Sequence, residues 1–387
     1  MRTAGIRGRA VACGATVLAV LLAAGCSSSE GDPLDRLSKA PPGSTAGPSA
    51  SAEPQVTRVS QPWQPGMRQH GIAIYWENNE DDTDQIVRAK AQKVLDHVVA
   101  LGANSISVSF SFVMDSAYAS AVRMDHPITP SPARLEVVLD EANKRGLRTA
   151  VRPMLNERNL TTDDPDMWRG SIRPESRTKW FASYRDMLVE YAKVAEAAKV
   201  ATFVVGTELN SLESSTTGWR TVATGVKAVY KGELDYSANH DRLRKTGPAS
   251  GITLSVDAYP PLKVPDSAPV SRLVDGWNEW LDKNRGEGSI RNLTLAEVAI
   301  GARSGAYEEP WSPRAKGSIK PEIQQRWFDA ACQVMRERDL AGIYFWMINF
   351  DADPKAKPSS KSPMDFLGRP GEQNIARCFT KDAKRAG

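Results

Sequence analysis

The chain has 387 residues, among them 50 basic and 46 acidic side chains, for a formal net charge of +4. Three of the arginines and none of the acidic residues lie in the first 25 residues, so the remaining chain carries 47 basic residues against 46 acidic ones. This near neutrality argues against a nucleic-acid-binding protein, which would need an excess of positive charge on one face.

The N-terminal segment has the features of an export signal. It begins with arginines, continues with an apolar run over residues 10–24, and ends in Ala23-Ala24-Gly25-Cys26, which resembles the bacterial lipobox. We therefore predict a lipoprotein signal peptide over residues 1–25 and a lipid on Cys26, which anchors the exported protein to the outer face of the bacterial cell membrane. The alternatives are an ordinary secretory signal and a membrane span, although the run is shorter than the roughly 20 residues that a spanning helix needs.

Residues 26–60 are rich in Ser, Pro, Gly and Ala and show no apolar period, so we expect a flexible tether there. A folded domain is expected over residues 61–387, acting as a monomer. Two of its residues, Cys332 and Cys378, either form a disulfide or remain separate buried thiols. The histidines are scattered and no Cys and His cluster has metal-ligand spacing, so we predict neither a metal site nor another cofactor.

Strand-like apolar runs alternate with segments of helical period along this domain. The pattern predicts strands over residues 71–76, 105–112, 148–155, 202–208, 234–238, 252–259, 292–298 and 342–348. It predicts helices over residues 84–101, 131–145, 176–199, 219–230, 270–284 and 321–338. Eight alternating units in about 320 residues indicate an α/β protein with a (β/α)8 TIM barrel.

One connection is short. Between the fifth and sixth strands, residues 239–251 have room for only a turn or two of helix, close to the minimum of about a dozen residues for a parallel crossover. A doubly wound open sheet is the alternative architecture, but no strand is followed by a Gly-rich phosphate-binding turn.

The carboxyl ends of the expected strands carry acidic, amide and aromatic residues. In a TIM barrel these ends face one shared pocket. Glu208 and Glu297 end buried strands, where a carboxylate is costly to desolvate, and this favours a catalytic role over a structural ion pair with an arginine. Sugar rings bind to aromatic faces and to amide or carboxylate groups. We therefore predict a carbohydrate site that contains Trp76, Arg152, Asn156, Asn210, Tyr236, Asn239, Asp257, Tyr259, Trp311 and Trp346.

The order of the motifs resembles a known family. Val205-Gly206-Thr207-Glu208-Leu209, Tyr236-Ser237-Ala238-Asn239, Asp257-Ala258-Tyr259-Pro260, Ala296-Glu297-Val298 and Phe345-Trp346 together look like glycoside hydrolase family 113, a clan A barrel family known for β-mannanases. The likeness covers nearly all of residues 66–350. One departure is Thr207, where many members of the clan have Asn.

The resemblance implies roles for individual residues. Glu208 would be the general acid/base and Glu297 the nucleophile of a hydrolysis with retained configuration, with Tyr259 bonded to the nucleophile and Trp346 as the floor of the sugar subsite. A positive charge at Arg152 would favour the ionised form of Glu297. A transglycosylase that uses the same glutamates, and a lipid-anchored barrel that binds a glycan without cutting it, are the alternatives.

Overall fold

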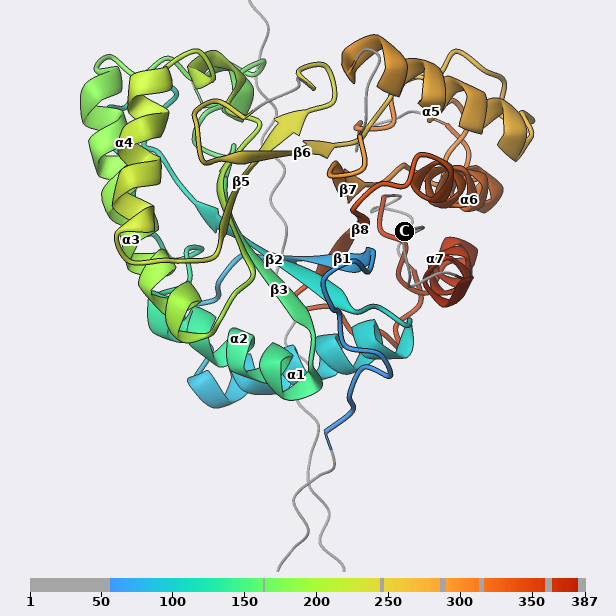
Figure 1. Ribbon diagram of the computed structural model, residues 1–387, viewed down its shortest axis with the longest axis horizontal. Helices are drawn as coiled ribbons and strands as arrows, with labels where there is room; N and C mark the ends of the chain where they lie inside the picture. Colours follow the sequence, from blue (N-terminus) through green and yellow to red (C-terminus); the bar gives the residue numbers. More distant parts are fainter. Residues whose placement is uncertain are drawn as a thin grey trace, which may run out of the picture. The chain divides into compact units, whose positions relative to one another are not determined.

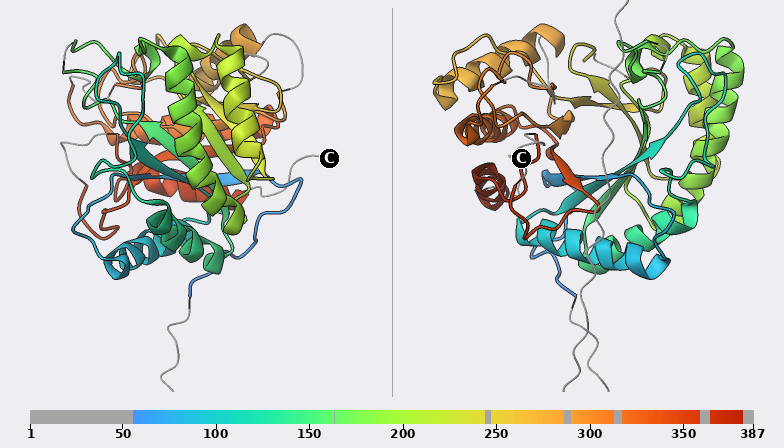
Figure 2. Two further views of the ribbon diagram at one scale, coloured as in Figure 1. Left: turned by 90° about the vertical axis from the view of Figure 1, so that its left-hand side faces the viewer. Right: turned by 180° about the vertical axis from the view of Figure 1, so that it is seen from behind.

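The computed structural model describes residues 56–162, 164–243, 247–285, 290–312, 317–358 and 364–381. Eight parallel strands form a closed barrel in chain order, and the helices lie outside it (Figures 1 and 2). The predicted (β/α)8 TIM barrel is therefore confirmed. The predicted signal peptide, Cys26 and most of the predicted tether lie outside the described residues.

The strands of the ring are short. They are β1 (Gln69–Trp76), β2 (Ser105–Phe112), β3 (Arg148–Leu155), β4 (Thr202–Thr207), β5 (Glu233–Asn239), β6 (Thr253–Asp257), β7 (Thr294–Val298) and β8 (Gly342–Asn349). The helices are α1 (Asp84–Ala100), α2 (Pro132–Arg145), α3 (Arg177–Ala197), α4 (Thr216–Lys227), α5 (Val270–Arg285), α6 (Pro321–Glu337) and α7 (Pro370–Lys381), with short 3-10 turns η1 (Arg169–Ser171) and η2 (Asn210–Leu212).

Local sequence signals set several helix ends. Thr83 caps α1 and Ser131 caps α2, each with its hydroxyl accepting a hydrogen bond from a backbone N–H of the first turn. Pro132 occupies the first turn of α2, where its missing N–H costs nothing. Gly146 then ends α2 in the left-handed conformation with φ +73°, which glycine adopts without strain. In the described part of the β5–β6 connection no helix forms, although the spacing leaves room for a turn or two.

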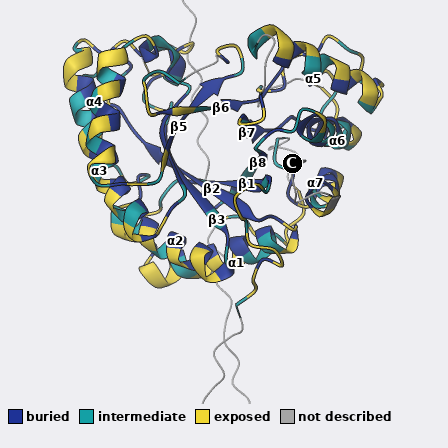
Figure 3. Cartoon of the chain, in the orientation of Figure 1, coloured by how far each residue is buried: buried dark blue, intermediate teal, exposed yellow. Residues whose placement is uncertain are grey.

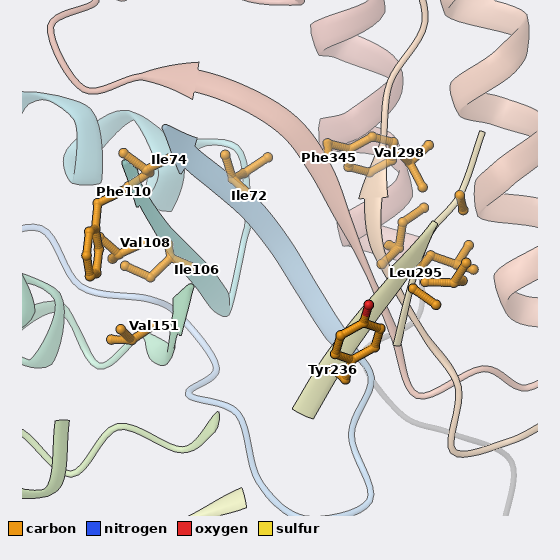
Figure 4. Packing of buried hydrophobic residues seen from close by; sticks show 14 of the residues in the cluster. Ile72, Ile74, Ile106, Val108, Phe110, Val151, Tyr236, Leu295, Val298 and Phe345 are labelled. Carbon is orange, nitrogen blue, oxygen red and sulfur yellow. The ribbon is translucent and has the colours of Figure 1, made fainter. Parts of the chain in front are cut away.

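The main apolar core lies between the strands and the helices. Along each strand alternate side chains point outward to the helix layer, and Figure 3 shows the strands buried and the helices exposed on their outer faces. Figure 4 shows part of the core, including Ile72, Ile74, Ile106 and Val108. Helix-borne Trp180, Trp219, Trp277 and Trp327 are all fully buried in the same cluster, as helical tryptophans packed against a barrel should be.

The interior of the barrel is polar at its N-terminal half. A cavity of about 190 Å³ lies there, bordered from above by Arg152. Typical barrels fill this space with bulky branched side chains. Here much of the lining is small or polar and includes Ser107, Ala150, Val204, Asp235, Ser255 and Ala296.

Three strands carry an extra residue relative to a neighbour. The pairing shifts between Val204 and Gly206 in β4 and between Leu295 and Val298 in β7. In β8 it shifts between Trp346 and Ile348, which pair with consecutive residues of β1. Such bulges change which face of the sheet the following side chains point to. Each of the three lies within a few residues of Glu208, Glu297 or Trp346.

Helix α7 was not predicted, and it covers the seam where the first and last strands meet. Phe379 of α7 stacks on His70 of β1 at 5.1 Å between ring centroids and packs against Phe345 of β8 at 5.7 Å. A disulfide joins Cys378 to Cys332 of α6, so of the two possibilities left open by the sequence the structure shows the bond. At the other end of the domain, ordered contacts begin at Val59, whose N–H donates to the carbonyl of Arg145 at 3.0 Å.

Removing the disulfide should destabilise the barrel without touching the strand ends. The bond closes a loop with a sequence separation of 46 residues, which corresponds to about 4 kcal/mol of unfolded-state entropy, and measured losses are commonly about 2–4 kcal/mol. We expect the double variant Cys332→Ala/Cys378→Ala to lose about that much unfolding free energy in a urea titration. Equal stability of the variant and the parent under oxidising conditions would contradict this.

Candidate active site

Glu208 follows directly on β4 and has an unusual backbone. Its φ is +54°, in the left-handed region that few residues other than glycine adopt, and its N–H donates to the carbonyl of Ser237 on β5 at 2.9 Å. Gly206 precedes it where a Cβ would meet Trp219 and Tyr236 at under 3.0 Å. The bulge, the glycine and the left-handed residue together end β4 and place the carboxyl group of Glu208 within reach of the other acidic groups described below.

Glu297 is held on both carboxylate oxygens. The Tyr259 hydroxyl donates to Oε2 at 2.7 Å, and Nη2 of Arg152 lies 2.8 Å from Oε1. The residue is only 5% exposed. The hydroxyl and the guanidinium together fix the direction of this buried carboxyl group.

Arg152 links four strands. Its Nη2 also lies 2.8 Å from both carboxylate oxygens of Asp257 on β6, and its Nε donates to the hydroxyl of Thr207 on β4 at 3.1 Å. Ser237 on β5 donates to Asp257 at 2.7 Å. The hydroxyl of Thr207, the residue that departs from the clan pattern, therefore accepts a hydrogen bond from Arg152. These contacts make a buried network that fixes Arg152 beside Glu297.

Glu208 has the weakest cationic contact of the three carboxyl groups. Its nearest guanidinium, that of Arg169, lies 4.0 Å away. Burial raises the pKa of Glu208 well above its usual range, and the negative charges of Asp257 and Glu297 act in the same direction, while Arg169 and Arg152 oppose the rise. This rise suits Glu208 to hold a proton near neutral pH, and burial also raises the pKa of Asp257, to about 7.

Trp346 lies at the end of β8 beside this network. The centroid of its ring lies 5.8 Å from Cζ of Arg152 and 5.6 Å from the ring centroid of Tyr75. A cis peptide bond joins Trp346 to Met347. The residue is partly exposed, so an aromatic face borders the carboxyl groups. Aromatic faces of this kind stack against the C–H surface of a sugar ring.

Amide groups surround the same strand ends. Asn156 donates to Glu77 at 2.8 Å and to Ser111 at 3.2 Å. Asn239 pairs in register with Asp257, and the buried Oδ1 atoms of Asn239 and Asn210 have no hydrogen-bond partner. Unpaired buried acceptors are costly, and a ligand with hydroxyl donors would satisfy them.

Trp311 lies in the β7–α6 loop and is 40% exposed. Its ring stacks on that of His240, the residue after β5, with 4.6 Å between centroids. Trp280 of α5 fixes the backbone at this point by donating to the carbonyl of His240 at 3.1 Å. The pair forms an exposed aromatic surface at the carboxyl side of the barrel.

Two residues of the predicted site are not brought to it. Trp76 is fully buried against Phe350, with 4.7 Å between ring centroids. Tyr236 packs edge-on against Trp219 of α4, donates to Glu213, and lies among the buried residues of Figure 4. Both are on the outward face of their strands, because side chains alternate along a strand.

Sequence reasoning missed other residues that the structure places here. Tyr75 is the inward neighbour of Trp76, and Ser237 is the inward neighbour of Tyr236. Strict alternation of apolar and polar residues in Leu234-Asp235-Tyr236-Ser237-Ala238-Asn239 was a signal that could have separated the two faces. No comparable signal marks Arg169, which comes from the β3–α3 loop.

Among the described residues there is no group of three or more His, Cys, Asp or Glu side chains that could hold a metal ion. Within the same part of the chain, every helix is too short or too polar to cross a bilayer.

A closed parallel barrel whose strand ends gather two glutamates, amides and an aromatic floor has the arrangement of a barrel glycoside hydrolase. The sequence profile of Glycoside Hydrolase Family 113 matches residues 76–368. The chain therefore belongs to this family and is a glycoside hydrolase. No curated protein matches it.

Solved structures of the family share the fold at low sequence identity. The β-mannanase of Alicyclobacillus acidocaldarius, solved in complex with ManMIm, is 23% identical with a TM-score of 0.62, over 81% of this chain and 97% of that one. A second family 113 β-1,4-mannanase is 19% identical with a TM-score of 0.65, over 82% and 99% of the two chains.

Arg152→Met should be severely destabilising. The change leaves the buried carboxylates of Asp257 and Glu297 without their shared cation, and removing one partner of a buried ion pair costs about 3–5 kcal/mol. Arg158→Met is the control, since that side chain is 61% exposed and its pair with Glu77 is worth at most about 1 kcal/mol. Chemical denaturation of both variants measures the difference, and similar losses in the two would contradict the assigned role of Arg152.

Proposed function

We propose that the protein is a retaining glycoside hydrolase that cleaves a β-linked mannan by double displacement, with Glu297 as nucleophile and Glu208 as acid/base. The observation that carries the proposal is the unequal treatment of the two glutamates. Glu297 is fixed between the Tyr259 hydroxyl and the Arg152 guanidinium, whereas Glu208 is buried near other negative charges with a guanidinium only at 4.0 Å. Two carboxyl groups in different surroundings within one pocket are what this reaction needs.

The chemistry follows from these states. Ionised Glu297 attacks the anomeric carbon, and Glu208 gives its proton to the departing glycosidic oxygen as that bond breaks. Glu208, now a carboxylate, takes a proton from water while the water oxygen bonds to the anomeric carbon. The bond between the anomeric carbon and Glu297 breaks as the bond to water forms, and the Glu297 carboxylate returns. In this scheme Tyr259 and Arg152 hold Glu297 in line and accommodate its change of charge.

The substrate class is supported by the family and by the surroundings of the pair. Relatives with the same fold are described as β-mannanases. We assign Trp346 to the floor of the subsite at the cleavage point, and the free acceptors of Asn210 and Asn239 to sugar hydroxyls. The Trp311 surface would contact a more distant sugar unit, and Asn156 would orient hydroxyls beside Tyr75.

Substitution of either glutamate tests the proposal. We expect Glu297→Gln to abolish release of reducing ends from β-1,4-mannan while mannan binding remains measurable by calorimetry. Glu208→Gln should reduce kcat/KM about 10²–10⁴-fold, the usual contribution of a general acid, and should lose less on an aryl glycoside whose leaving group needs no proton. A parent protein that binds mannan but releases no reducing ends, with a Glu297→Gln variant that behaves identically, would identify a binding module instead.

Retention is tested separately by the first product formed. Proton NMR of a fresh digest should show the β-anomer before mutarotation. The initial appearance of the α-anomer would indicate inversion and remove Glu297 from the nucleophile role.

We also propose that the enzyme is exported and held at the outer face of the cell membrane by a lipid on Cys26. The support is the order of basic start, apolar run and small residues before that cysteine. The expected result for Cys26→Ser is transfer of the protein from the washed membrane fraction to the soluble fraction, with unchanged activity per molecule. Equal membrane retention of both forms would exclude the anchor.

A further inference from the structure

Arg169 is a charged residue beside the acid/base that the mechanism above does not use. It begins η1 in the β3–α3 loop, and its side chain is only 17% exposed. Its Nη1 atom lies 4.0 Å from Oε2 of Glu208. This distance is too long for a hydrogen bond but short enough for a strong Coulomb interaction in a buried pocket.

Glu157 fixes the direction of that side chain. One carboxylate oxygen of Glu157 accepts both the backbone N–H of Arg169 at 3.2 Å and its Nε at 2.9 Å. The guanidinium is therefore tied at its Nε edge, and the opposite end is left toward Glu208. Holding the long side chain of Arg169 in one direction costs conformational entropy. A contact with no role in the site would not offset that cost.

The other charges facing Glu208 come from three strands. Arg152 on β3 is engaged by Asp257 on β6 and Glu297 on β7, and the latter two carry negative charge toward Glu208. The hydroxyls of Tyr236 and Tyr259 also interact with Glu208, and burial raises the pKa of both. The position of Arg169 is thus set by Glu157 and not by the network around Arg152.

We propose that Arg169 is a positioning residue for the second half of the reaction, in which it favours the carboxylate form of Glu208 that activates water. The inference rests on the proposed function. During attack on the sugar, Glu208 is protonated and neutral, so Arg169 contributes little. Once the proton has left with the departing oxygen, Glu208 is an anion near buried Asp257, while Glu297 is an uncharged ester. A cation at 4.0 Å stabilises the Glu208 carboxylate until it takes a proton from water.

The experiment compares Arg169→Met with Arg169→Lys on 2,4-dinitrophenyl β-mannobioside. This leaving group departs without a proton, so hydrolysis of the glycosyl-enzyme limits kcat. For Arg169→Met we expect kcat to fall about tenfold, a part of what a general base contributes, with KM falling in proportion and kcat/KM almost unchanged. Stopped-flow traces should then show a burst of one dinitrophenolate per active site. Lysine should restore most of kcat.

The pH profile on unactivated mannan gives a second readout. Because kcat/KM requires protonated Glu208 in the free enzyme, loss of the cation raises the pKa of Glu208 and moves the alkaline limb to higher pH in Arg169→Met. Glu157→Gln, which releases the guanidinium without removing it, should produce a smaller shift in the same direction. Arg173→Met, at an exposed arginine of the same loop, is the matched control and should change neither readout.

Thermal unfolding of each variant confirms that it is folded before kinetics are compared. Equal losses of kcat and kcat/KM in Arg169→Met, without a burst or a shifted limb, would show a structural role and overturn the inference while the proposed function stands. If Arg169→Met does not fold, the Lys and Glu157→Gln variants decide, and unchanged kinetics in Glu157→Gln would overturn the inference. A parent enzyme that cleaves no β-mannoside removes the proposed function and this inference together.

Discussion

A single buried guanidinium organises the carboxyl end of this barrel. Arg152 is placed on β3 by the inward alternation of that strand and lies 2.8 Å from carboxylate oxygens on both β6 and β7. Burying one arginine with two acids is favourable only with good hydrogen-bond partners, and Ser237, Thr207 and Tyr259 supply several of them. The arrangement leaves Glu208 as the acid without a close cation, and that asymmetry separates the two glutamates chemically.

Departures from ideal strand geometry give the site its shape. A regular ring of strands would alternate strictly, yet β4, β7 and β8 each take an extra residue near their carboxyl ends. In β7 the extra residue lets Glu297 point inward after Ala296, which also lines the interior. The bulges therefore select which side chains meet in the pocket, while the rest of each strand keeps its apolar face against the helices.

The sequence was sufficient for the barrel because its signals are local and repeated. The alternation of strand-like runs with segments of helical period predicted all eight strands and six of the helices, with ends within a few residues. Helix α7 was missed because it follows the last strand, where the alternating pattern of the barrel has ended. Their positions at strand ends predicted a shared site for Glu208, Glu297, Arg152, Asp257 and Tyr259. Trp76 and Tyr236 also lie at strand ends, but their side chains point outward, so the prediction placed them in the site wrongly. Arg169 could not be predicted, since its position depends on a loop whose path is set by tertiary contacts.

The seam between β1 and β8 has a consequence for how the enzyme is made. Gln69 pairs with Gly342, so the ring closes only after nearly the whole domain has been synthesised, and α7 covers the joint later still. Pairing across such a long separation is slow and leaves strand edges exposed in the meantime. The Cys332–Cys378 bond forms last in chain order and covalently retains the covering helix. Oxidation would thus tie α7 to α6 over an already assembled ring, whereas in the reduced protein only noncovalent packing would hold α7 there.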